Sequence, residues 1–222
     1  MEANQFELPK TPINPSRKLA WNSMKQEVIG FKDGLGKGLD VGITDTIVAL
    51  RCLGINTTQS CEGHLDWATG APYVDIRGVD TKELEVQAKE AFNNARTEHD
   101  ANPTNQQIYS PLYEKAHGLR KEIATKHLAE VKKAFDLIAE FYQNKQTPYD
   151  KKLILSPFGD GSARIESQGA IFQEIAKPEV KKKKLQEYQE EMNSFTIFLK
   201  DKFLNTKSSR FKNLLKRLFH LS

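Results

Sequence analysis

The 222-residue sequence predicts an α+β fold in which two β-hairpins form a small, mainly antiparallel sheet covered by several helices. Two short apolar segments flank the glycine-containing stretch 62–71, and two more flank the turn at 158–161, as is typical of hairpins. Longer segments with apolar residues three and four positions apart surround these hairpins and indicate helices. The C-terminal half holds the longest of these segments, so we expect long C-terminal helices.

The helices are delimited by capping residues and by glycine. Ser16 is a candidate N-cap for a helix that runs to about Phe31. Thr44 is a candidate N-cap for a short helix, with Asp45 at its positive end and Gly54 beyond its last residue. Further helices are expected over 81–100, 110–144 and 178–204.

The strands are expected at 55–60 and 72–77 in the first hairpin, and at 152–156 and 163–167 in the second. Between them the helix over 110–144 is the longest segment with helical periodicity. The simplest arrangement of these elements is one sheet with helices on one face.

Composition and charge divide the chain into three parts. Residues 1–16 contain three prolines and predict an extended arm, and residues 17–204 predict a single α+β domain. Residues 205–222 carry five basic residues and no acid, interleaved with apolar residues at helical spacing, so they predict a basic amphipathic C-terminal helix. Subtracting these five charges from the net +4 leaves −1 for residues 1–204, which argues against a globally basic nucleic-acid-binding protein.

The tail admits two interpretations. Its apolar stripe can dock on the body, or its basic face can contact an anionic surface such as a membrane, a nucleic acid or an acidic partner. No stretch approaches the roughly 18 apolar residues of a membrane-spanning helix, so we expect no transmembrane segment. The first residues do not resemble a signal peptide, and Cys52 and Cys61 are too few for a disulfide framework. We therefore expect a cytoplasmic protein.

Chemically versatile side chains concentrate where the first predicted strand ends. A thiol, a carboxylate and an imidazole follow one another at Cys61, Glu62 and His64, with a glycine between the last two. These three are the candidate catalytic residues. Cys61 can act as a nucleophile with His64 as its base, or can be a small buried residue. The neighbouring candidates for ligand binding are Ser60, Asp66 and Trp67.

Strand alternation adds charged residues to this region. Asp75 and Arg77 share a face of the second predicted strand, opposite the apolar Val74 and Ile76. Arg164 and Glu166 share a face of the last predicted strand. If the two hairpins pair into one sheet, these four charged residues approach the candidate site and suit a polar or anionic ligand. The alternative is a set of cross-strand ion pairs on a solvated face.

A metal site is the less favoured interpretation of the same region. Cys61 and His64 form a C-x-x-H pair, and Asp66 or Asp75 can add a carboxylate ligand. The other histidines fall in helical or tail segments, and Cys52 falls on a helix. We therefore expect no metal ligands in this chain.

A resemblance extends these expectations. An aromatic residue and a lysine at Trp21 and Lys25 lead to Asp40, and a short helix then precedes the strand end Thr57-Thr58-Gln59-Ser60-Cys61-Glu62-Gly63-His64. This order resembles the N-terminal part of the tRNA wybutosine-synthesis methyltransferase family, whose strand ends in Thr-Ser-Ser-Cys-Ser-Gly-Arg. Residues 21–76, about a quarter of the chain, carry the resemblance. It implies S-adenosylmethionine-dependent modification of tRNA on a duplicated α/β fold.

We therefore expect a small intracellular enzyme that acts on a polar or nucleotide-like substrate, with RNA modification as one form of that activity. S-adenosylmethionine is the cofactor that the resemblance implies, and the residues themselves indicate none. The alternatives are a non-catalytic ligand-binding protein and an interaction protein that works through its long helices.

Overall fold

The computed structural model describes residues 14–32, 36–66 and 70–205. The predicted arm over 1–16 and the predicted basic helix over 205–222 lie almost entirely outside these ranges, as does Trp67. Within the described residues, none of the helices combines the length and the apolar character needed to cross a membrane.

The strands form one antiparallel sheet, which confirms the α+β prediction. Its order is β1 (Thr57–Cys61), β2 (Tyr73–Ile76), β4 (Ala163–Ser167) and β3 (Leu153–Pro157). The two hairpins therefore join through β2 and β4, which pair antiparallel from Tyr73↔Glu166 to Ile76↔Ala163. This pairing makes the faces of both hairpins continuous, and it places β1 and β3 at opposite edges.

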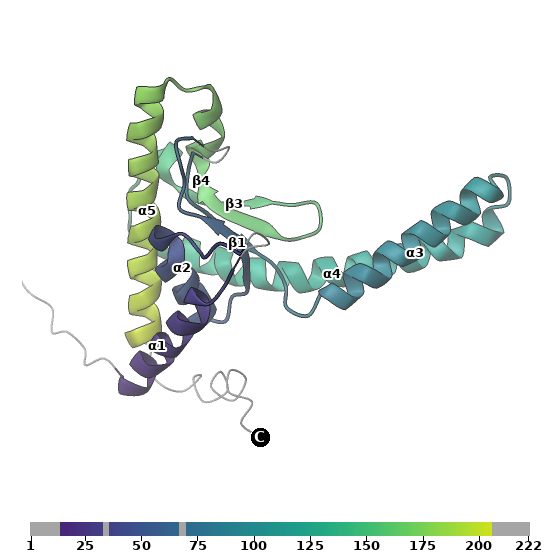
Figure 1. Ribbon diagram of the computed structural model, residues 1–222, viewed down its shortest axis with the longest axis horizontal. Coiled ribbons are helices and arrows are strands. Elements are labelled where there is room, and N and C mark those ends of the chain that lie inside the picture. Colours follow the sequence, from purple (N-terminus) through teal and green to yellow (C-terminus); the bar gives the residue numbers. More distant parts are fainter. Residues whose placement is uncertain (1–13, 33–35, 67–69, 206–222) are drawn as a thin grey trace, which may run out of the picture.

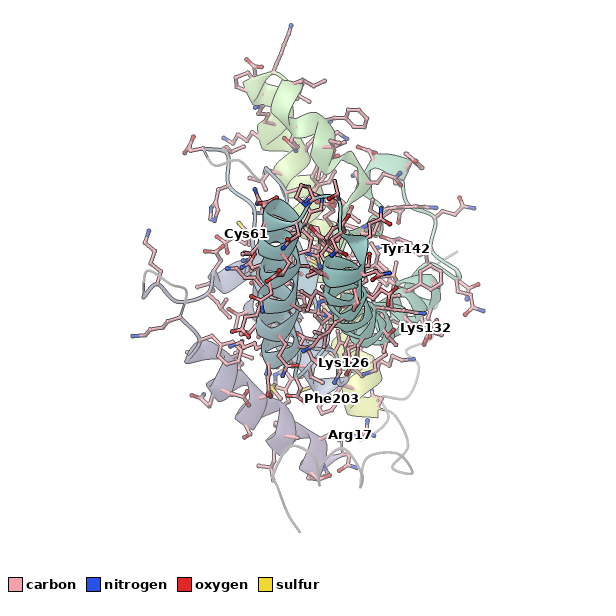
Figure 2. The ribbon with its side chains drawn as sticks, turned by 90° about the vertical axis from the view of Figure 1, so that its right-hand side faces the viewer. Arg17, Cys61, Lys126, Lys132, Tyr142 and Phe203 are labelled. Carbon is pink, nitrogen blue, oxygen red and sulfur yellow. The ribbon has the colours of Figure 1, made fainter. Side chains whose placement is uncertain are left out.

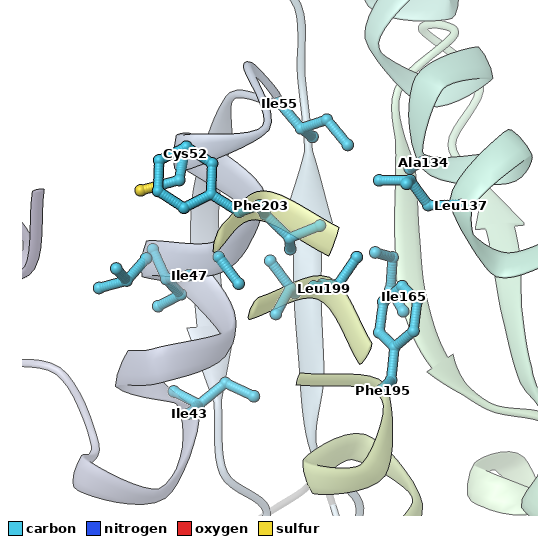
Figure 3. Close-up of a cluster of buried hydrophobic side chains, with 14 of the residues drawn as sticks. Ile43, Ile47, Cys52, Ile55, Ala134, Leu137, Ile165, Phe195, Leu199 and Phe203 are labelled. Atoms are coloured by element: carbon cyan, nitrogen blue, oxygen red, sulfur yellow. The ribbon is translucent and has the colours of Figure 1, made fainter. Parts of the chain in front are cut away.

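One face of the sheet is covered by helices. Figure 1 shows α5 (Pro178–Asn205) along one side of the body, with α2 (Val41–Cys52) and α1 (Pro15–Ile29) beside it. In Figure 3, Ile47 of α2, Ile165 of β4 and Leu199 of α5 converge in one apolar cluster, and all three side chains are at most 2% exposed. Burial of such side chains is the main stabilising contribution to this packing.

The remaining long helices form a hairpin that extends away from the body (Figure 1). It consists of α3 (Lys82–Ala101) and α4 (Gln106–Phe141), and the 36 residues of α4 span about 54 Å. Ala88, Ala91 and Ala95 are buried on one side of α3, so the two helices pack closely. The short helices η1 (Tyr149–Lys151) and η2 (Gln168–Ile175) flank the second hairpin.

The predicted starts of α1 and α2 are wrong. Helix α1 begins at Pro15, and the side chain of Asn14 accepts a hydrogen bond from the backbone N–H of Ser16 at 3.0 Å, so Asn14 is the N-cap. Helix α2 begins at Val41 with Asp40 as its N-cap residue. Thr44, the predicted cap, lies inside the first turn and donates its hydroxyl to the Asp40 carbonyl at 2.9 Å. The helix thus includes Gly42, a residue that weakens helices on average.

Candidate functional site

The end of β1 lies against the beginning of α2, and this contact assembles the candidate site. Among the described residues, Asp40, Cys61 and His64 each offer one oxygen, sulfur or nitrogen atom, and these atoms all lie within 4.8 Å of one another. All three side chains are partly exposed. Figure 2 shows Cys61 toward one side of the molecule and Tyr142, which contacts the first residue of β3, toward the other. The cluster therefore occupies the β1 edge of the sheet.

Asp40 is the centre of the cluster. Its Oδ2 atom accepts a hydrogen bond from the Glu62 backbone N–H at 3.1 Å and lies 3.3 Å from His64 Nε2. Partial burial raises the pKa of Asp40, but the hydrogen bonds from the Glu62 backbone, His64 and Cys61 outweigh burial and lower that pKa below its usual value. Asp40 is therefore an anion that holds the imidazole and the thiol beside it.

The Glu62 side chain points to the beginning of α2. Its Oε2 atom accepts a hydrogen bond from the Gly42 backbone N–H at 2.6 Å, which places a negative charge at the positive end of the helix. A Cβ atom at Gly42 would lie 2.7 Å from this oxygen, so glycine permits the close approach. The contact fixes the loop after β1 to α2, and Glu62 thus holds the cluster together from outside it.

Gly63 sets the direction of the chain between Cys61 and His64. Its φ of 84° lies in the left-handed region that glycine adopts without strain. A Cβ atom at this position would meet the backbone carbonyl carbon of Ala71 at 2.7 Å and the Leu185 side chain at 2.8 Å. The Gly63 backbone N–H also donates to the Cys61 sulfur over 3.3 Å. Both His64 and the sulfur thus depend on a glycine for their positions.

The polar face of the sheet begins at Cys61. Cys61 pairs with Tyr73 across β1 and β2, and Tyr73 pairs with Glu166 across β2 and β4. Paired residues of antiparallel strands share a face, so these three side chains form a row that leads from the cluster across the sheet. Ser60 pairs with the fully buried Val74 and therefore faces the core side. Its hydroxyl is buried without a hydrogen-bond partner among the described residues.

The next row contains a paired arginine. Arg164 donates from Nε and Nη2 to the two carboxylate oxygens of Asp75, at 2.7 and 3.1 Å. Its guanidinium also lies 3.7 Å from the centre of the Tyr73 ring. The hydrogen bonds from Arg164 to Asp75 raise the pKa of the guanidinium above its usual value. Glu166 in turn accepts a hydrogen bond from the Ser156 hydroxyl. Asp75, Arg164 and Glu166, three of the four predicted charged residues of the hairpins, thus lie on one continuous polar face.

Two candidates lie apart from the cluster. Arg77 forms ion pairs with Asp160 at 2.6 Å and Glu85 at 3.9 Å, at the base of the α3–α4 hairpin. Asp66 is exposed in the loop after His64. Trp67 lies outside the described residues.

Asp40 is the site residue that sequence reasoning did not place in the site. It precedes Cys61 by 21 residues, and only the docking of α2 on β1 brings it close. One signal for it was present, because Asp40 is part of the order of residues that resembles the wybutosine-synthesis family.

Comparisons with protein-family models, with curated proteins and with solved structures found no match to this chain. The resemblance to the wybutosine-synthesis methyltransferases stays a prediction. The chemistry of the site must therefore be inferred from its own residues.

Proposed function

We propose that this chain is an intracellular enzyme that acts on a polar or nucleotide-like substrate, with Asp40, Cys61 and His64 as its reactive centre. The observation that carries the proposal is the convergence of these three side chains, which come from two separate segments of the chain. A thiol and an imidazole beside an ionised carboxylate supply a nucleophile or metal ligand, a proton carrier and an orienting anion.

The row of polar residues supports the substrate class. Tyr73 and Glu166 follow Cys61 on the same face, and both are partly exposed. A phenol and a carboxylate can accept hydrogen bonds from the hydroxyl and amino groups of a nucleoside, and the Tyr73 ring offers an edge to a base. We therefore place the substrate along this row, with its reacting atom at the cluster.

A ligand panel tests this proposal. Thermal shifts would be measured for the full chain with nucleosides, nucleoside monophosphates and S-adenosylmethionine, which the resemblance implies as cofactor. We expect a member of the panel to stabilise the wild-type protein, and Glu166→Gln to reduce the shift. Glu114→Gln, the same change at an exposed position of α4, is the matched control. A shift that Glu166→Gln leaves intact, or no shift with any compound, would argue against a substrate on this face.

RNA modification is the more specific form of the proposal, and only the resemblance over residues 21–76 supports it. It is tested by methyl transfer from labelled S-adenosylmethionine to total tRNA, with Cys61→Ser and His64→Asn as site variants. Transfer by the wild type that both variants lose supports this form. No transfer at any enzyme concentration contradicts it and leaves the other substrates of the panel open.

Non-catalytic ligand binding is a second candidate function, because a pocket lies at the base of the α3–α4 hairpin. It has a volume of about 470 Å³ and an apolar floor that includes Phe92 and Ile123. Its charged lining has three basic residues against two acids, and one of the basic residues, Arg120, lies 4.6 Å above the Phe92 ring. Arg120→Gln tests this candidate. The change should weaken binding of an anionic compound of the panel and should not alter binding of compounds that depend on Glu166.

We also propose that the basic tail over 205–222 contacts an anionic surface. Its support is the sequence pattern of five basic residues around an apolar stripe. Removal of residues 206–222 should abolish salt-sensitive retention on anionic vesicles or RNA and leave the unfolding transition of the body unchanged. Unfolding of the truncated chain would instead mean that the stripe docks on the body.

A further inference from the structure

We propose that Asp40, Cys61 and His64 bind one Zn²⁺ ion. This inference deepens the function proposed above and rests on the same cluster. It revises the expectation from the sequence, which offered only Asp66 or Asp75 as a third ligand beside Cys61 and His64 and did not favour a metal site. The structure supplies that ligand from the residue before α2, and not from Asp66 or Asp75.

The distances in the cluster suit a tetrahedral ion. Zinc binds carboxylate oxygen, imidazole nitrogen and thiolate sulfur at about 2.0 to 2.3 Å, which separates neighbouring ligand atoms by roughly 3.3 to 3.8 Å. Asp40 Oδ2 and His64 Nε2 already lie 3.3 Å apart, and the three donor atoms lie within 4.8 Å of one another. The donor atoms therefore need to shift by about 1 Å to surround an ion.

The donor set selects the kind of metal. A thiolate with an imidazole favours zinc and other late transition metals, whereas magnesium and calcium prefer sites made of oxygen atoms. Thiolate and carboxylate charges together neutralise a divalent cation. Three protein ligands leave a fourth position open for water or a substrate atom, as in catalytic zinc sites. Because all three side chains are partly exposed, water or a substrate can reach this fourth position.

The surroundings orient the ligands. The Glu62 backbone N–H donates to Asp40 Oδ2, and the Gly63 backbone N–H donates to the Cys61 sulfur over 3.3 Å. The second contact helps to fix the position of the sulfur beside Asp40 and His64. The Glu62 side chain ties the same loop to α2 through Gly42. Such outer contacts are a regular part of protein metal sites.

Zinc affinity of the full chain is the first measurement. The protein is freed of metal with a chelator, and Zn²⁺ binding is followed by competition with a chromophoric chelator. We expect one Zn²⁺ per chain and an affinity more than about 100-fold weaker in Cys61→Ser and His64→Asn, beyond what loss of an outer contact costs. Co²⁺ in place of Zn²⁺ should give a thiolate-to-metal charge-transfer band that Cys61→Ser abolishes.

His99→Asn is the matched control, because His99 lies 3.4 Å from an exposed aspartate, Asp100, without a thiol nearby. A measurement on the wild type decides the question even if the site variants do not fold. Zn²⁺ should protect Cys61 from iodoacetamide, whereas the buried Cys52 should stay unmodified with or without metal.

Three results would overturn the inference: no Zn²⁺ bound by the wild type, equal affinity in the site variants, or alkylation of Cys61 that Zn²⁺ does not slow. The outcome is separate from that of the ligand panel. If the chain binds a panel compound through Glu166 and does not bind Zn²⁺, the proposed function is supported and the zinc site is refuted. If the chain binds Zn²⁺ and no panel compound, the zinc site is supported and the proposed substrate class is refuted.

Discussion

The Asp75 carboxylate lies in the middle of the sheet with only 9% of its side chain exposed, and Arg164 compensates its charge. Because two hydrogen bonds join the groups and the arginine also stacks on Tyr73, the pair is fixed in one geometry. This arrangement indicates that the pair supports the polar face structurally. The substrate that we propose would then contact Tyr73 and Glu166, which are partly exposed.

Arg164→Met should therefore destabilise the fold by about 2 to 3 kcal/mol, because it leaves a nearly buried carboxylate without its partner. The double variant Asp75→Asn/Arg164→Met should lose less than the sum of the single changes, since the uncompensated charge is gone. Urea unfolding of the wild type and three variants measures this cycle. A midpoint of Arg164→Met equal to that of the wild type would mean that the ion pair contributes no stability.

His127 is fully buried between the hairpin and the sheet. Its Nδ1 atom accepts a hydrogen bond from the Gly78 backbone N–H at 2.9 Å, which requires the neutral ring. Burial lowers the pKa of His127 below its usual value, Asp160 and Glu85 oppose this shift, and Arg77 adds to it. The unfolded chain therefore takes up this proton at a higher pH than the folded chain does.

The contribution of neutral His127 to the free energy of unfolding should therefore be fully present above about pH 7. It should decline as the pH falls below about 6.5, by at most roughly 1.4 kcal/mol per pH unit. His127→Gln should flatten the profile between pH 7 and 5, and His99→Gln, at a partly exposed position, should not. The measurement is the free energy of unfolding in urea at several pH values. Identical profiles for wild type and His127→Gln would contradict the assignment.

At the scale of elements, the site depends on how the loop after β1 is held between α2 and α5. Glu62 contacts α2 through its side chain, and its carbonyl accepts a hydrogen bond from the Gln189 amide of α5 at 3.0 Å. Gly63 lets the chain pass close to Ala71 and Leu185 at the same point. Both helices thus determine where His64 lies.

Gly63→Ala should destabilise the fold by about 3 kcal/mol or more, because a left-handed φ costs a non-glycine residue about 1 to 3 kcal/mol and the new Cβ meets backbone atoms. Gly118→Ala is the control, since Gly118 lies within α4 and a Cβ there contacts nothing within 4 Å. That change should stabilise by about 0.5 to 1 kcal/mol. Thermal unfolding distinguishes them, and equal shifts would show that the loop can move away from Ala71.

At the scale of the whole molecule, the sequence predicted the sheet because strand alternation is a local pattern. Val74 and Ile165 face the apolar core, and Asp75 and Arg164 lie on the opposite face of the sheet, as the two-residue period of a strand requires. Sequence proximity likewise brought Cys61 and His64 together. The position of Asp40 was not predictable in this way, because it depends on how α2 packs against β1. The start of α2 was misplaced because Asp40 and Thr44 are both favoured N-cap residue types, and local preference does not choose between them.

The long helix α4 shows a similar limit. The sequence predicted its start at Ser110, directly before a proline, whereas α4 begins at Gln106 and continues through Pro111. Proline inside a helix removes a hydrogen bond, so a local rule places the helix start there. Packing of α3 along α4 overrides that rule, with edge contacts from Phe92 of α3 to Tyr113 and from His99 of α3 to Tyr109 on either side of Pro111. Tertiary contacts thus decided the starts of α2 and α4, which local patterns misplaced.

The central claim is that Asp40, Cys61 and His64 act as one site, and the rate at which iodoacetamide modifies Cys61 tests it most directly. The rate is measured on the metal-free full chain by peptide mass spectrometry. Cys52 serves as the internal control, because it is 2% exposed and burial raises its pKa to about 12. Asp40→Asn should accelerate modification of Cys61 by about tenfold, since it removes a negative charge beside the sulfur. His64→Asn should slow modification. In the double variant, the change in the logarithm of the rate should differ from the sum of the two single changes. If Cys61 reacts at the same rate in all four proteins, the three side chains are not coupled and the claim is wrong.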